Sequence, residues 1–185
     1  MTPFVSRAGQ KLEHAISIFG VAVKDKICAD LGCSTGGFVD CLLQHGAKKV
    51  YAIDTGYGVL DWKLRQDGRV VVMERSNAMH VVLPEPVQIV TIDVGWTRQR
   101  NILPSALRML AQDGIVVTLI KPHYEAEASQ LRRGVLSEAA LPAVIQGVRG
   151  DAKACGFDWI ADVPSPIKGR GGNVELLALL RPAKV

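Results

Sequence analysis

The chain has 185 residues, 48% of them hydrophobic and 22% charged, so it can bury a core without a disulfide or a metal. Its 18 glycines and 9 prolines are too few for a low-complexity or collagen-like chain. The net charge of +4 permits a polyanionic partner but does not require one.

The first predicted element is a helix over residues 7–19, with Ser6 as its N-cap and Gly20 as its stop. The apolar stripe that predicts it consists of Leu12, Ala15, Ile16 and Phe19. Lys11 lies on the margin of that stripe.

Five short runs follow that are apolar on both faces, as in the strands of a buried parallel sheet. They are residues 27–29, 50–53, 70–73, 89–92 and 115–120. Helical stretches are expected at residues 37–44, 102–111 and 138–155, with Pro142 in the first turns of the last one.

Residues 158–162 and 174–180 end the chain without a helix between them, so we expect an antiparallel pair. The alternation of strands and helices predicts an α/β fold. Its sheet should be mostly parallel, with an antiparallel C-terminal strand and helices on both faces.

Four predicted strands end at a charged residue, namely Asp30, Asp54, Asp93 and Lys121. Ligands of open α/β sheets bind at the carboxyl ends of the strands, so we expect these four side chains to line one crevice. One such charge is commonly a solvated boundary, whereas four in register favour a functional site.

The turn after the first strand is rich in glycine and opens a helix, so its N–H groups should face a ligand. It is not a P-loop, because no lysine follows Gly37. It is not G-x-G-x-x-G either, because three residues separate Gly32 from Gly36. The acidic residue before the first glycine suits a ligand less anionic than a pyrophosphate, such as S-adenosylmethionine. Asp30 would then face the cationic end of that ligand, the loop N–H groups its carboxylate, and Asp54 its ribose hydroxyls.

Six motifs spread over nearly the whole chain carry a resemblance to a known family. They are residues 6–13, 31–38, 62–67, 92–94, 121–122 and 172–175. Together they resemble the catalytic part of TlyA-type, FtsJ-like rRNA 2′-O-methyltransferases, which are sometimes labelled haemolysins. The resemblance implies a class I S-adenosylmethionine-dependent methyltransferase fold of the Rossmann-like kind.

The resemblance also implies a catalytic Lys-Asp-Lys-Glu tetrad, which falls by motif on Lys11, Asp93, Lys121 and Glu175. Lys121 would take the proton of a ribose 2′-hydroxyl, with Asp93 orienting it. Glu175 stands in a predicted apolar strand, where a carboxylate needs a lysine partner. The turn and the resemblance together give the expected cofactor-binding residues: Asp30, Gly32, Ser34, Thr35, Gly36, Gly37, Phe38, Asp54, Asn77 and Asp93. No metal is required.

The sequence departs from the family pattern at two of these motifs. After Asp93 the family usually has Val-Ser-Phe, and this chain has Val94-Gly95-Trp96. After Lys121 it has His123-Tyr124 where Gln-Phe is common. The chain also starts where the family's small N-terminal RNA-binding domain ends, so we expect residues 1–185 to form a single catalytic domain.

Other functions stay open at this point. One is an RNA- or ribosome-binding module that keeps the fold without turnover. Another is membrane lysis, which rests only on the family label and ranks last, because no apolar stretch approaches the roughly 20 residues of a span.

A charge of +4 is small for gripping rRNA without the extra domain. A separate RNA-binding partner could supply the missing affinity for RNA, the chain could be a shortened form, or its target could differ from that of the family. The oligomeric state is open. No signal peptide is evident, and the four cysteines match no disulfide or zinc pattern, so we expect a cytoplasmic protein with reduced thiols.

Overall fold

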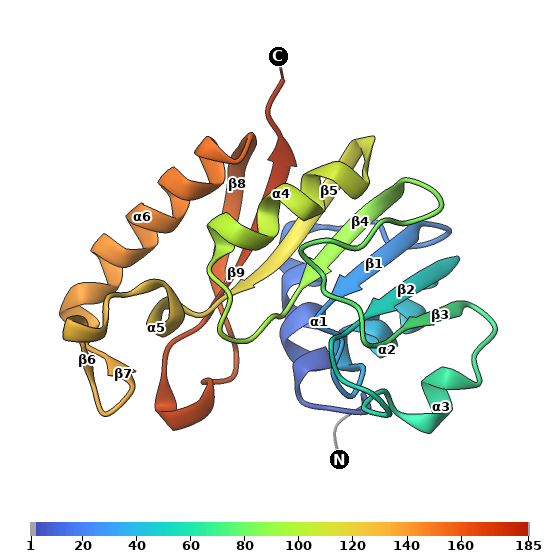
Figure 1. Ribbon diagram of the computed structural model, residues 1–185, viewed down its shortest axis with the longest axis horizontal. Helices are drawn as coiled ribbons and strands as arrows, with labels where there is room; N and C mark the ends of the chain where they lie inside the picture. The colour runs from blue at the N-terminus through green and yellow to red at the C-terminus, as the bar shows by residue number, and fades with distance from the viewer. Residues whose placement is uncertain (1–2, 185) are drawn as a thin grey trace.

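A computed structural model describes residues 3–184, so positions 1–2 and 185 of the predicted domain lie outside the described residues. The main strands are β1 (Ile27–Leu31), β2 (Lys49–Ile53), β3 (Val70–Met73), β4 (Val87–Ile92), β5 (Leu110–Ile120), β8 (Phe157–Pro164) and β9 (Leu176–Pro182). They form one seven-stranded sheet in the order β3-β2-β1-β4-β5-β9-β8 (Figure 1). The first five run parallel, and β9 is antiparallel to both of its neighbours.

The predicted fold class and all seven predicted strands are confirmed. The strands form because their β-branched and apolar side chains are covered on both faces of the sheet. β5 begins at Leu110, earlier than the apolar run that predicted it, and its pairing with β4 shifts register between Val87 and Ile89.

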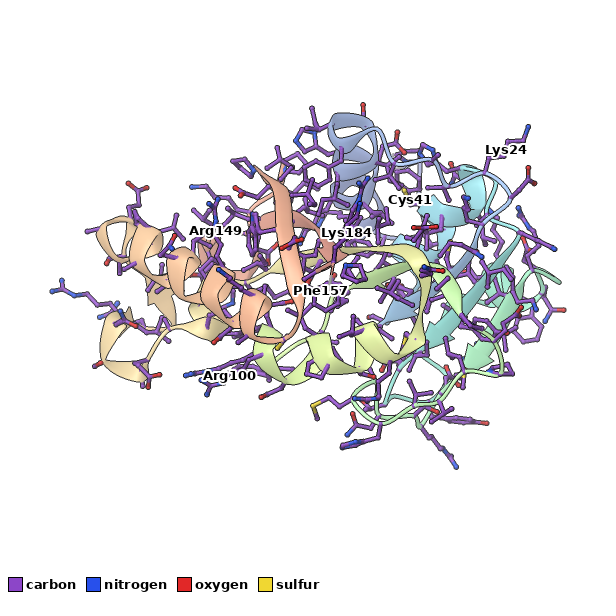
Figure 2. All side chains as sticks on the ribbon, turned by 90° about the horizontal axis from the view of Figure 1, so that it is seen from above. Lys24, Cys41, Arg100, Arg149, Phe157 and Lys184 are labelled. Atoms are coloured by element: carbon purple, nitrogen blue, oxygen red, sulfur yellow. The ribbon has the colours of Figure 1, made fainter. Side chains whose placement is uncertain are left out.

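Helices cover both faces of the sheet. They are α1 (Ala8–Phe19), α2 (Gly37–Gln44), α3 (Trp62–Arg65), α4 (Gln99–Met109), α5 (Pro122–Glu125) and α6 (Leu141–Ala154), with 3₁₀ turns at Ala128–Gln130, Glu138–Ala140 and Arg170–Gly172. In Figure 2, α1 and α4 lie on opposite sides of the sheet. Two hydrophobic clusters result, and the adjacent β5 residues Val116 and Val117 point into different ones.

The helix ends follow the sequence signals with one exception. Gly20 ends α1 in the left-handed conformation, and Pro142 lies in the first turn of α6, as predicted. The predicted N-cap at Ser6 is wrong by one residue, because Arg7 already has helical angles and takes that position without a side-chain cap. In residues 3–184, no helix combines the length and the apolar character that crossing a membrane would need.

Candidate active site

The turn between β1 and α2 is tied to the neighbouring strand ends. Gly32 has φ +85°, and a Cβ there would lie 2.7 Å from the carbonyl oxygen of Asp93, so only glycine fits. The backbone N–H groups of Ser34 and Gly56 donate to the two carboxylate oxygens of Asp54, at 2.8 and 2.7 Å. Asp54 therefore fixes the turn against the end of β2.

A cavity of about 450 Å³ opens beside this turn, a size common among small-molecule sites. Five of the predicted cofactor residues line it, namely Gly32, Ser34, Asp54, Asn77 and Asp93. The side-chain oxygen of Asn77 accepts from the backbone N–H of Met79 at 2.9 Å, which leaves its amide N–H₂ for another partner. Of the four predicted strand-end charges, Asp54, Asp93 and Lys121 share this cavity.

Asp30 does not lie on the cavity wall, which corrects the prediction that it faces the crevice. It is the fourth residue of β1 and is almost fully buried. Its Oδ1 accepts from Thr91 Oγ1 at 2.7 Å, whereas Oδ2 has no hydrogen-bond partner among the described residues. Burial raises the pKa of Asp30 to about 7 against the hydrogen bond from Thr91, and the nearby carboxylates of Asp93 and Asp54 add to the rise.

We expect Asp30→Asn to stabilise the protein more at about pH 8 than at about pH 5. Because the pKa of Asp30 is raised to about 7 from 3.8, its protonation stabilises the fold fully below pH 3.8, and this contribution is lost as the pH rises through about 7. Asparagine keeps the acceptor for Thr91 and cannot ionise. Calorimetric Tm values at both pH values test this, with the exposed Asp113→Asn as control. An equal gain at both pH values would contradict the expectation.

The remaining predicted cofactor residues lie outside the cavity: Thr35, Gly36, Gly37 and Phe38. Phe38 is buried in the core, and Thr35 is exposed and accepts from the backbone N–H of Asp61 through its carbonyl. The glycines permit close packing, because a Cβ at Gly36 would meet the side chain of Leu64. A Cβ at Gly37 would meet Ser6 Oγ and would lie 2.8 Å from the Gly9 nitrogen. Their sequence signal is thus a packing signal in this structure.

The four residues of the predicted tetrad come together although they are far apart in the sequence. β5 pairs with β9 through Ile120 and Leu176, which brings Lys121 and Glu175 to the same end of the sheet. Lys121 Nζ lies 2.6 Å from Asp93 Oδ1 and donates to the Val94 carbonyl at 3.2 Å. Lys11 Nζ donates to Glu175 Oε2 at 2.5 Å, so the expectation that Glu175 has a lysine partner is confirmed.

The predicted position of Glu175 inside a strand is wrong. The β8–β9 ladder ends at the pair Pro164–Leu176, so Glu175 directly precedes β9, and its carbonyl still accepts from the Ser165 N–H at 2.9 Å. Its side chain is only 4% exposed and packs on Gly169, where a Cβ would collide with the carboxylate. The carboxylate is therefore confined between this glycine and Lys11.

A second cavity of about 470 Å³ contains the whole tetrad. Among residues 3–184 it shares Asp93 and Lys121 alone with the first cavity, so this ion pair stands where the two cavities meet. The exposed side chains of Arg7 and Lys168 line the second cavity as well. Positive charge at its rim favours a negatively charged occupant.

An aromatic cluster beside the junction could not be predicted from the sequence. Trp96 stacks on Tyr124 with ring centroids 4.8 Å apart, and His123 lies 4.2 Å from the same ring. Trp96 is 85% exposed and has φ +60°, an uncommon conformation for a bulky residue. The two segments that depart from the family pattern are thus in contact. In the sequence, the departures themselves were the only signal at these positions, and nothing indicated that they meet. Trp62, in the motif over residues 62–67, is 74% exposed and so lies outside the core.

The donor set fits S-adenosylmethionine in the first cavity. Its wall carries the carboxylates of Asp54 and Asp93, which suit a ligand with an ammonium and a sulfonium. Gly32 and Ser34 of the turn line the same wall. A hydroxyl in the second cavity could approach the first at the Asp93–Lys121 pair.

Comparison with known proteins agrees with this geometry. The family model described as FtsJ-like methyltransferase matches residues 4–181. Hemolysin A of Brachyspira hyodysenteriae is 42% identical over 181 residues, covering 95% of this chain and 75% of that protein. The 16S/23S rRNA (cytidine-2′-O)-methyltransferase TlyA of Mycobacterium tuberculosis is 38% identical over 184 residues, covering 96% and 68%.

Solved structures show the same architecture. The one described as "Putative hemolysin from Streptococcus thermophilus" has a TM-score of 0.96 at 40% identity and covers 100% of this chain and 69% of its own. At 15% identity, an S-adenosylmethionine dependent methyltransferase from Mesorhizobium loti has a TM-score of 0.67, which shows the fold alone, over 91% of this chain and 96% of that one. The chain therefore belongs to the FtsJ-like methyltransferase family and has the class I methyltransferase fold.

Proposed function

We propose that the chain is an S-adenosylmethionine-dependent methyltransferase that modifies a ribose 2′-hydroxyl of ribosomal RNA. The observation that carries the proposal is the junction of two cavities at the Asp93–Lys121 ion pair, one cavity suited to the cofactor and one with a basic rim. The name of the Mycobacterium tuberculosis relative supports the ribose and the ribosomal RNA. A ribosomal target implies that the protein acts in the cytoplasm. We assign residues 3–184 to one catalytic domain, because one seven-stranded sheet runs through them.

S-adenosylmethionine, when bound, supplies an electrophilic methyl group on a sulfonium. We assign Gly32, Ser34, Asp54, Asn77 and Asp93 to hold it, because they line the first cavity. Each oxygen of Asp54 accepts one backbone N–H and keeps a lone pair for a ribose hydroxyl.

We assign the tetrad to the nucleophile. Lys121 Nζ accepts the proton of the 2′-hydroxyl in its neutral form, because an ammonium has no acceptor. Asp93 holds that nitrogen at the junction, and the Lys11–Glu175 pair fixes the opposite wall. General base catalysis contributes about 10²–10⁴-fold, and alignment of the reacting atoms contributes up to roughly 7–11 kcal/mol. Positioning is then the larger part of the effect.

Transfer of labelled methyl from S-adenosylmethionine to unmodified ribosomal RNA tests the proposal. We expect incorporation into 16S or 23S rRNA, and primer extension at low nucleotide concentration should stop at one ribose. Calorimetric titration of S-adenosylmethionine accompanies the assay. If the protein bound RNA but neither transferred a methyl group nor bound S-adenosylmethionine, the proposal would be contradicted and a binding module favoured.

We expect Trp96→Ala to raise the KM for RNA by roughly 10-fold, because stacking on one base contributes about 1–3 kcal/mol. The exposed indole stands beside the junction, where a base attached to the reacting ribose needs a platform. Trp96→Phe should retain most of the affinity. Trp62→Ala, which removes an exposed tryptophan outside both cavities, is the control. Equal KM values for the two alanine variants would rule out this role.

A further inference from the structure

A small β-hairpin projects from the chain between α5 and α6. Its strands are β6 (Leu131–Arg132) and β7 (Val135–Leu136), and its two-residue turn, Arg133-Gly134, has φ +52° and +79°. Positive φ at both turn positions is typical of a type I′ hairpin. None of its six residues is buried, so it adds almost nothing to the core.

A hairpin of this size is not stable by itself, and one side chain from elsewhere holds it. Asn173 is 5% exposed and reaches the hairpin with both ends of its amide. Its Nδ2 donates to the Gly134 carbonyl at 3.0 Å, and its Oδ1 accepts from the Leu136 N–H at 3.1 Å. These bonds fix the turn and the second strand.

The same residue belongs to the segment that carries Glu175. The carbonyl of Asn173 accepts from the Gly169 N–H at 2.9 Å. Gly169 is the residue against which the Glu175 carboxylate packs. Asn173 therefore connects the hairpin to the wall of the second cavity.

The hairpin carries two adjacent arginines. Arg132 and Arg133 are exposed, and neither guanidinium has an ion pair or hydrogen bond with any side chain or backbone group in residues 3–184. Arg7 and Lys168 add positive charge at the rim of the second cavity. Guanidinium groups bind phosphate in a bidentate manner, and phosphate contacts position a nucleic acid.

We propose that the β6–β7 hairpin is an arm that binds backbone phosphates of the RNA substrate, and that Asn173 is a positioning residue that keeps this arm in register with Glu175. The inference rests on the proposed function, because it takes RNA as the substrate. Phosphates held at Arg132 and Arg133 would place the target ribose over the tetrad. The arm supplies part of the RNA affinity that a net charge of +4 alone does not explain.

The first test compares the double variant Arg132→Ala/Arg133→Ala with Arg181→Ala, an exposed arginine at the other end of β9. RNA affinity is measured against salt with a fragment of unmodified rRNA. Each lost phosphate contact lowers the slope of log K against log salt by about 0.7–0.9, so we expect a decrease of about 1.5 for the double variant and none for the control. The kcat at saturating RNA should fall as well, because phosphates held at these arginines place the target ribose over the tetrad.

The second test uses trypsin, which cleaves after arginine. Asn173→Asp keeps the acceptor for Leu136 and loses the donor to Gly134, so native-state cleavage after Arg133 should be roughly 10-fold faster than in the wild type. RNA should slow the cleavage of the wild type. An unchanged Tm would show that the variant is folded.

The arm hypothesis is overturned if the double variant matches Arg181→Ala in its salt slope, or if RNA leaves the cleavage rate of the wild type unchanged. An unchanged cleavage rate in folded Asn173→Asp overturns the role of Asn173. If the double variant loses RNA affinity while the wild type transfers no methyl group, the arm stands and the proposed reaction falls.

Discussion

Lys121→Ala should lower the rate of methyl transfer to RNA by about 10²–10⁴-fold. Its Nζ lies where the two cavities meet, held by Asp93 and by the Val94 carbonyl. The variant removes the proton acceptor and leaves the Gly32 turn and Asp54 in place. The Kd for S-adenosylmethionine, measured by calorimetry, should therefore change by only a few-fold.

Two further variants sharpen this expectation. Lys121→Arg keeps a positive charge beside Asp93 but cannot give up its proton, so it should be as inactive as the alanine variant. Lys24→Ala, at an exposed position between α1 and β1 that is labelled in Figure 2, should have wild-type activity. If Lys121→Arg retained most of the rate, the lysine would act only through its charge.

Gly32→Ala should weaken S-adenosylmethionine binding by at least about 10-fold and destabilise the fold by about 1–3 kcal/mol. The residue has φ +85°, and the new Cβ would lie 2.7 Å from the Asp93 carbonyl oxygen. Relief of that contact moves either the turn or Asp93, and both belong to the first cavity. For a chain of this length we expect Tm to fall by about 2–10 °C.

Gly68→Ala is the matched control for this variant. No atom lies within 4 Å of a Cβ built at Gly68, and its φ is not positive, so alanine should leave Tm unchanged or raise it slightly. Wild-type cofactor affinity in Gly32→Ala would show that the turn does not hold the cofactor.

Much of the fold could be predicted because its strands are buried on both faces and read as continuous apolar runs. The residues 70–73 and 37–44 were predicted with the bounds of β3 and α2. Strand ends were harder to predict, because pairing partners set them. Glu175 lies one residue before β9, where one backbone hydrogen bond from Ser165 remains, and no local signal at Glu175 reveals this.

The proximity of the four tetrad residues could be predicted through the family resemblance, and they do line one cavity. The glycine-rich turn was harder, because a glycine that faces a ligand and one that permits packing look alike in a sequence. Gly32 lines the cavity, whereas Gly36 packs against Leu64. The contact between Trp96 and Tyr124 joins two segments that are far apart in the chain. No local pattern in the sequence indicates that they lie together.

The close approach of α1 and α2 at Gly37 has a consequence for sequence divergence. A Cβ at Gly37 would meet Ser6 and the Gly9 backbone, so backbone atoms set the spacing of the two helices there. α1 carries Lys11, and α2 begins at the cofactor turn. Surface residues on either helix can therefore drift without altering how far Lys11 stands from the turn, whereas a single methyl group at position 37 would alter it.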